Sequence, residues 1–173
     1  LINCGYLKSF GDVGVDGKLR NITTTQDQTS PLPYISDMDG NWNDTSASSP
    51  WVWGHTVWDF PNSTGVDDTK IDWNIVKTSN NIISNTQDVT LLGLVVEANQ
   101  LTITNTTGFQ NETNIGHALN ITHYLKLDGN IDLIGESQLV QKRYTPTQVS
   151  GSILDVASGG YLERDQQGTT NLY

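Results

Sequence analysis

The amino-acid sequence predicts an all-β fold, a parallel β-helix (β-solenoid) with short coils that is preceded by a Trp-rich, irregular β capping block. The main observation is a set of paired apolar residues that recur every six positions between 119 and 141. The pairs are Leu119 and Ile121, Leu125 and Leu127, and Ile131 and Leu133, and Leu139 continues the series. Because residues at i and i+2 share one face of a strand, each pair indicates a short strand with one inward face.

Two further observations support this fold class. Residues 128–130 and 134–136 separate the pairs, and each segment contains a glycine, which tolerates the positive φ of a tight corner. No stretch longer than a turn or two has convincing helical periodicity. Strands this short that turn every six residues favour a coil that stacks on itself.

Three segments follow one another along the chain. Residues 1–30 form an N-terminal strand or linker segment, which combines short apolar stretches with a polar string. Residues 31–79 form the Trp-rich capping block, which holds all five tryptophans. Residues 80–173 are predicted to contain the solenoid coils, and we expect these coils to continue into further sequence of a larger parent protein.

The spacing of the apolar pairs also predicts the length of one coil. Leu101 lies 18 positions before Leu119, so we expect three six-residue units to complete a coil and these two leucines to stack. The series Leu127, Leu133 and Leu139 is expected to point into the interior of the coil.

Composition and charge exclude several classes of partner. The chain has 19 acidic and 9 basic residues, a formal charge of −10, and no basic stripe interleaved with aromatic residues, which argues against nucleic acid as a partner. No apolar run approaches the roughly 20 residues of a membrane helix, so membrane insertion is not expected. Cys4 is the single cysteine, and an internal disulfide is therefore impossible.

The sequence carries no recognisable catalytic motif, and we expect a protein that is not an enzyme. It lacks a Gly-x-Ser-x-Gly elbow, a phosphate-binding loop and a dinucleotide fingerprint. A polysaccharide lyase on a solenoid face would combine acidic residues with a basic one. The basic residues after position 126 lie where the coil pattern breaks and near the end, at Lys142, Arg143 and Arg164.

An acidic and amide-rich stretch is the best candidate for a metal site. Its alternate residues could supply several oxygen ligands to Ca²⁺ from one tight loop, and they are Asp37, Asp39, Asn41 and Asn43. The glycine at position 40 comes too early for an EF-hand, and no Glu closes a twelve-residue loop. A simple turn rich in Asp and Asn is the other interpretation, and it is favoured.

The tryptophans at Trp51, Trp53 and Trp58 support two interpretations. Exposed indoles stack on sugar rings, so these residues are candidates for binding surface glycans. Large aromatic side chains are more often buried, and a tryptophan cluster could cover the open end of a solenoid, where uncovered strands invite edge-to-edge pairing. Packing is favoured over ligand binding.

Asn-x-Ser/Thr sequons occur six times, at Asn21, Asn43, Asn62, Asn105, Asn111 and Asn120. Such sequons are acceptors of N-linked glycans in eukaryotic secreted proteins. In a chain this rich in Asn and Thr, chance explains most of them.

Residues 125–141 and 154–173 resemble segments of very large, secreted, adhesin-like surface proteins of flavobacteria and related Bacteroidetes. The most distinctive part is the string Gly-x-Leu-Glu-Arg-Asp-Gln-Gln-Gly-Thr, which begins at Gly160. The resemblance covers roughly residues 80–173. It implies export by the type IX secretion system to the extracellular face of the outer membrane, with the secretion and surface machinery and other domains of the parent chain as partners.

The expected function is therefore that of a non-catalytic segment of an exported adhesin-like protein. The segment would serve as a stiff spacer and binding surface in gliding or surface attachment. The alternative is a carbohydrate-active module, either a glycan-binding Trp block or a polysaccharide lyase on a solenoid face. No cofactor other than the candidate Ca²⁺ is expected, and the resemblance transfers no catalytic residue.

Overall fold

The computed structural model describes residues 33–52, 59–64, 68, 70–105, 115–141, 153–155 and 159–165. Its regular elements are strands, which confirms the all-β part of the prediction. They are β1 (Tyr34–Ile35), β2 (Gly40–Asn41), β3 (Ile75–Thr78), β4 (Ile82–Ser84), β5 (Val89–Val96), β6 (Gln100–Ile103), β7 (Ala118–Leu127), β8 (Asn130–Leu133), β9 (Gln138–Gln141), β10 (Ile153–Asp155) and β11 (Tyr161–Arg164).

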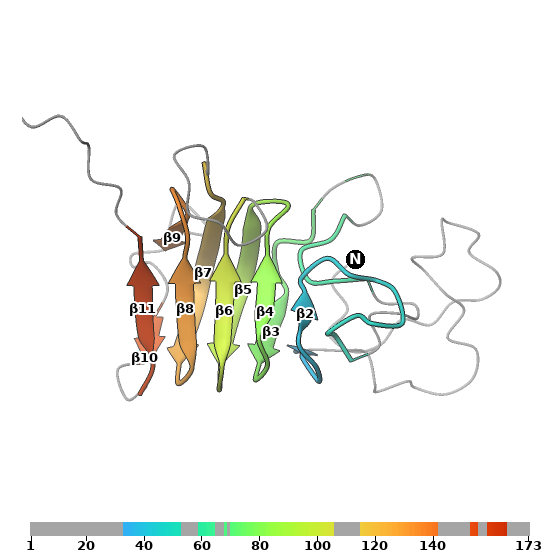
Figure 1. The fold of residues 1–173 in the computed structure, drawn as a ribbon, viewed down its shortest axis with the longest axis horizontal. Coiled ribbons are helices and arrows are strands. Elements are labelled where there is room, and N and C mark those ends of the chain that lie inside the picture. The colour runs from blue at the N-terminus through green and yellow to red at the C-terminus, as the bar shows by residue number, and fades with distance from the viewer. Residues whose placement is uncertain are drawn as a thin grey trace, which may run out of the picture.

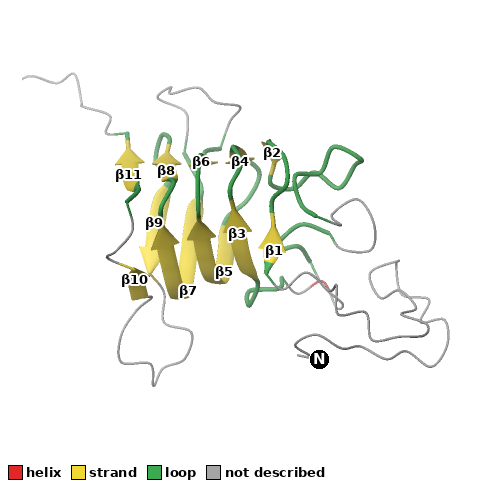
Figure 2. Ribbon diagram, turned by 90° about the horizontal axis from the view of Figure 1, so that it is seen from below, coloured by secondary structure: helices red, strands yellow, loops and turns green. Residues whose placement is uncertain are grey.

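The strands form two sheets, and every pairing between named strands is parallel. The first sheet has the order β1-β3-β5-β7-β10, with β9 also paired to β7, and the second has the order β2-β4-β6-β8-β11. From β1 to β8 the chain therefore passes from one sheet to the other after each strand. Figures 1 and 2 show the two sheets as facing layers, with the strands of each in chain order along the molecule.

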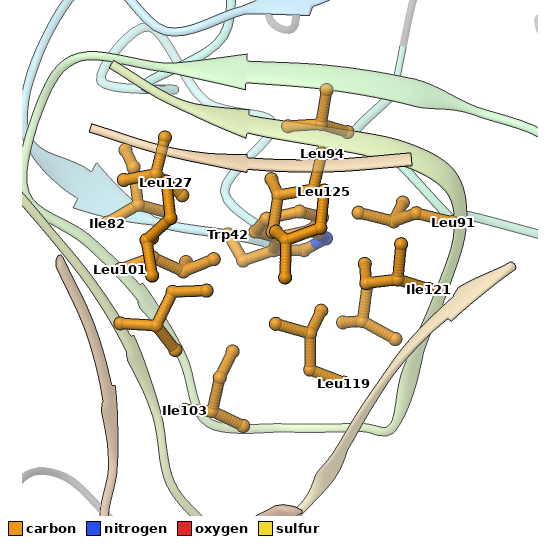
Figure 3. Close-up of a cluster of buried hydrophobic side chains, with 14 of the residues drawn as sticks. Trp42, Ile82, Leu91, Leu94, Leu101, Ile103, Leu119, Ile121, Leu125 and Leu127 are labelled. Atoms are coloured by element: carbon orange, nitrogen blue, oxygen red, sulfur yellow. The ribbon is translucent and has the colours of Figure 1, made fainter. Parts of the chain in front are cut away.

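The parallel register places apolar residues of successive strands in rows that run across each sheet. In the first sheet Val76 pairs with Leu94, and Leu94 pairs with Leu125. In the second sheet Leu101 lies between Ile82 and Ile131. All of these side chains are buried, and Figure 3 shows side chains from both sheets meeting in one interior. Burial of each such side chain stabilises the fold by about 1.5–3 kcal/mol.

The predicted inward series is found on the interior side of the strands. Leu127 and Leu133 are buried, and Leu139 is half-buried and packs against the same cluster. The alternation of apolar and polar residues therefore identified the buried face of β7 and β8 correctly.

The predicted stacking of Leu101 on Leu119 is wrong. Leu101 pairs with Ile131, whereas Leu119 pairs with Val89 and belongs to the other sheet. A repeat of 18 positions is found elsewhere, between Val76 and Leu94.

The physical reason lies in β7, which is one strand of ten residues rather than two short strands with a corner between them. Its register shifts relative to β5, since Leu91 pairs with Ile121 but Gly93 pairs with Tyr124. The extra residue forms a bulge, and a bulge bends a strand without ending it. Both apolar pairs of β7 can therefore face the interior.

The two glycines expected at corners have different roles. Gly135 has a φ of 66°, so it occupies the left-handed conformation that the turn requires. Gly129 is needed for a close approach instead, because a Cβ atom at this position would lie 2.7 Å from the carbonyl carbon of Ala98 in the preceding corner. The corners therefore stack on one another in the same way as the strands.

Candidate functional site

The N-terminal end of the two sheets is covered, and we call it the closed end, defined by Trp42, Pro50 and Trp51. Trp42 follows β2 and is buried, and its indole N–H donates to the carbonyl oxygen of Pro61 at 2.8 Å. The indole N–H of Trp51 donates to the carbonyl oxygen of Trp42 at 2.7 Å. The two rings meet edge to face, with centroids 4.9 Å apart. Both indoles are therefore used in packing.

The backbone next to these tryptophans closes the outer edge of β1. Ser36 and Trp51 form an antiparallel bridge, and the Val52 N–H donates to the carbonyl oxygen of Ile35 at 2.9 Å. Pro50 lies against Gly40, where a Cβ atom would be 3.3 Å from the proline ring. A strand from another molecule would find these positions already occupied.

Tyr34 completes the aromatic cluster of the closed end. Its ring centroid lies 6.3 Å from that of Trp51, at an interplanar angle of 85°. Burial, followed by the nearby charge of Asp59, raises the pKa of Tyr34 to about 12. The phenol therefore stays neutral across the physiological range.

The glycan-binding interpretation fails for Trp51, because the side chain is only 1% exposed and offers no ring face to a sugar. Trp53 and Trp58 lie outside the described residues. Trp42, which the sequence did not single out, is the residue on which Trp51 packs. Its large aromatic side chain, which favours burial, was the available signal.

The four candidate calcium ligands are divided between a strand segment and the turn that follows it. Gly40 and Asn41 belong to strand β2, so Asp37, Asp39 and Asn41 are spread along an extended segment, and Asn43 lies in the turn after it. The carboxylate of Asp39 accepts hydrogen bonds from the backbone N–H and the side-chain amide of Asn81, at 2.8 and 3.1 Å, and these bonds lower its pKa. Among the described residues, no group of three or more His, Cys, Asp or Glu side chains is arranged to hold a metal ion.

The neighbouring acidic residue, Asp44, takes part in a local turn. Asp44 Oδ1 accepts the backbone N–H of Ser46 at 2.8 Å, a turn of the Asx type. Hydrogen bonding to the Ser46 side chain, followed by this backbone bond, lowers the pKa of the Asp44 carboxyl. The favoured interpretation of this stretch, a turn rich in Asp and Asn, therefore describes residues 44–46. The side chains of Asp37 and Asn41 are exposed, and that of Asn43 is half-buried.

The outer face of the second sheet carries stacked carboxylates. Asp132 on β8 pairs in register with Glu163 on β11, and Gln100 Nε2 donates to Asp132 Oδ2 at 3.0 Å. Burial, followed by the charges of Glu163 and Asp165, raises the pKa of Asp132. The register that brings Glu163 beside Asp132 is a property of the fold and leaves no local signal in the sequence.

The carboxylate of Asp88, which lies just before β5, contacts the residues at the start of β7. Asp88 Oδ1 accepts the backbone N–H of Ala118 at 2.9 Å and lies 3.2 Å from His117 Nδ1. The N–H of Ala118 is the main cause of a lowered pKa at Asp88, and His117 and Lys70 act in the same direction against burial. The contact stabilises the ionised carboxylate.

In the described part of the chain, β11 is the last strand at the opposite end of the second sheet, and we call it the open edge. All four of its residues are exposed. Leu162 pairs with the fully buried Ile131 yet remains 46% exposed, because no described strand lies on its other side. A Cβ atom at Gly159 would meet nothing within 4 Å. Among the described residues, the two sheets are therefore covered at the closed end and uncovered at β11.

Comparisons with protein-family models, with curated proteins and with solved structures found no match for this chain. The described part of the chain contains no helix with the length and apolar character needed to cross a bilayer.

Proposed function

We propose that this chain is a β-solenoid segment of an exported, adhesin-like surface protein, in which it acts as a stiff spacer and binding surface and not as an enzyme. The observation that carries the proposal is the regular passage of the chain between two parallel sheets with matched rows of buried residues. In such a stack each coil contacts only its neighbours, so length can be added without redesigning the core.

Contacts between successive coils support a rigid assembly. β5 and β7 pair through seven residues, and Asn99 Nδ2 donates to the carbonyl oxygen of Ser79 in the preceding corner at 2.7 Å. Lys77 and Glu97 form an ion pair at 2.8 Å between neighbouring coils. Surface pairs of this kind contribute little individually, so the backbone ladders and the apolar rows are the main support for stiffness.

The difference between the two ends indicates at which end the segment can be extended. At the closed end the outer edge of β1 is already occupied, whereas at the open edge no described strand pairs with the outer side of β11, and Leu162 is partly exposed. We propose that a further coil of the parent protein stacks on β11 and buries Leu162. Other domains of the parent chain are then the first partners of this segment.

The export route rests on the resemblance of residues 80–173 to proteins secreted by the type IX system. An acidic surface with a formal charge of −10 agrees with a soluble, extended surface protein. The carbohydrate-active alternative has lost one of its three candidate tryptophans, because Trp51 is buried. No contact among the described residues favours it as a second function.

Two measurements on the source cells test the proposal. An antibody against the chain should label intact cells as strongly as permeabilised cells, with a cytoplasmic protein as the negative control. Intact mass spectrometry with peptide mapping should find a much larger parent with sequence on both sides of the segment. Labelling that requires permeabilisation would contradict surface exposure, and a protein with the mass of this chain alone would contradict the role of a spacer within a larger protein.

A further inference from the structure

Four of the six sequon asparagines lie among the described residues, and their surroundings differ sharply. An N-linked glycan is attached to Nδ2 of asparagine, so the acceptor amide needs a free hydrogen and space for a sugar ring. The exposure and hydrogen bonding of each asparagine therefore decide whether the folded chain can carry a glycan there. The four are Asn43, Asn62, Asn105 and Asn120.

Asn62 is a buried junction between connections that lie far apart in the sequence. It is 1% exposed, and its Nδ2 donates to the carbonyl oxygen of Ile71 at 3.1 Å and to Asp72 Oδ1 at 3.0 Å. Its Oδ1 accepts the backbone N–H of Thr90 on β5 at 3.0 Å. Both amide hydrogens are used, and a sugar would have to displace the connection that Asn62 ties to β5.

Asn120 lies within β7 and has a neighbouring strand on each side. It pairs with Thr90 of β5 and with Val140 of β9, and it is 8% exposed. Its Nδ2 donates to the carbonyl oxygen of Val89 at 3.3 Å. A sugar on this nitrogen would lie against the paired strands, so the pairing of β5 with β7 and the modification compete.

Asn43 differs from both in its contacts. It follows β2 in a turn, its side chain is half-buried, and its amide makes no hydrogen bond within the described part of the chain. Thr45, the third residue of its sequon, is exposed. The neighbouring Asp44 is held by its bond to Ser46, so the sequon lies on an ordered surface turn.

We infer that the folded chain can carry an N-linked glycan at Asn43 and cannot carry one at Asn62 or Asn120. The chain must then fold before, or without, modification at the two buried sequons. A route of maturation that glycosylates the chain before folding would block the pairing of β5 with β7. This inference depends only on the hydrogen bonds and burial of the three asparagines, and it stands independently of the proposed function.

The test uses the purified full chain, a soluble asparagine glucosyltransferase and UDP-glucose. In the reaction the Nδ2 atom loses a proton and bonds to C1 of glucose, while the C1–O bond to the diphosphate breaks and UDP leaves. The folded protein and the urea-unfolded protein, diluted into the reaction, are compared by peptide mass mapping. We expect hexose at Asn43 in both samples, and at Asn62 and Asn120 only in chains that were modified while unfolded.

The melting temperature of each product tests whether a sugar at that asparagine is compatible with the native fold. Chains with hexose at Asn62 or Asn120 should fail to recover the native transition, whereas chains with hexose at Asn43 alone should keep it. Hexose at Asn62 or Asn120 in a chain with the native melting temperature would overturn the inference. So would an Asn43 that is modified only in the unfolded sample.

Substitutions that lengthen the side chain by one methylene make the result independent of the enzyme. Asn120→Gln should lower the melting temperature by on the order of 5 °C, and the matched Asn43→Gln should leave it unchanged. A native melting temperature for Asn120→Gln would mean that the site has spare room, which contradicts the inference. A loss of stability in Asn43→Gln would contradict the assignment of Asn43 as the accessible acceptor.

Discussion

Gly160 and Gly129 lie backbone to backbone in adjacent corners of the stack, where a Cβ atom on Gly160 would clash with the carbonyl oxygen of Gly129. The Gly160 N–H also donates to the carbonyl oxygen of Leu127 at 3.0 Å. No side chain fits between these two corners, so the docking of β11 depends on a glycine at position 160.

Gly160→Ala should therefore release β11 from β8. The expected cost is about 1–3 kcal/mol, as for other overpacked sites, and it should appear locally as faster amide exchange over residues 161–164. Gly159→Ala is the matched control, because a Cβ atom at Gly159 meets nothing within 4 Å. Equal protection of β11 in the two variants would contradict the close approach.

Leu133→Asp should disrupt the core, because it places an unpaired carboxylate in a row where Leu133 is buried beside Ile103. We expect a loss of about 4 kcal/mol or more in the free energy of unfolding, measured by urea denaturation. Ile83→Asp is the control on the same sheet, since Ile83 is exposed and should cost about 1 kcal/mol. Similar losses in both variants would mean that Leu133 does not face the interior.

Trp42→Ala should destabilise the closed end, because it removes a buried ring that contacts Trp51 and leaves the carbonyl oxygen of Pro61 without its donor. The expected loss is about 3–5 kcal/mol. Trp73→Ala serves as the comparison, because Trp73 is exposed and should cost less than about 1 kcal/mol. Denaturant titrations followed by circular dichroism measure both variants, and a small effect at Trp42 would argue against the packing assigned to it.

Asp132→Asn should stabilise the protein at neutral pH. The raised pKa of Asp132 means that the folded state favours the protonated carboxyl. The stabilisation that comes from this protonated form is present at low pH and is lost as the pH rises through the raised pKa. The variant should melt a few degrees above wild type at pH 7, and the difference should vanish near about pH 3. A pH-independent difference would point to packing instead of charge.

Asp88→Asn should have the opposite effect. The pKa of Asp88 is lowered, mainly by the N–H of Ala118, so its stabilisation is present above the ordinary pKa and is lost as the pH falls through the lowered one. The variant should melt below wild type at pH 7, by no more than about 3 °C because the carboxyl is largely exposed, and the two should converge in acid. Thermal melts across a pH series measure this, and a gap that widens in acid would reverse the assignment.

The sequence predicted the buried face of the strands well and the pairing between strands poorly. Alternation with a period of two residues follows from the geometry of any strand, so Leu127 and Leu133 were placed correctly. The stacking partner of Leu119 depends on the length of the connections and on the bulge near Leu91, and neither leaves a local signal. The same fixed period of six that identified the strands therefore gave the wrong strand pairing.

The candidate calcium site shows the same limit of prediction from a sequence pattern. Asp37, Asp39 and Asn41 alternate as ligands in a loop would, but alternation is equally the pattern of the outward face of an extended segment. The contact between Asp39 and Asn81 joins residues 42 positions apart, which no motif in the sequence indicates. Burial of Trp51 was predictable from side-chain size, whereas its contact with Trp42 is visible only in the fold.

The number of residues between successive members of one row is unequal, and this has a practical consequence for engineering. Val76 and Leu94 are 18 positions apart, and Leu94 and Leu125 are 31 apart, yet all three occupy one row of the first sheet. Because lengthening a connection costs little free energy, peptides inserted between strands should be tolerated where a single deletion within a strand is not. Sequence alignment of redesigned versions should therefore match the rows of paired residues and allow gaps of any length between them.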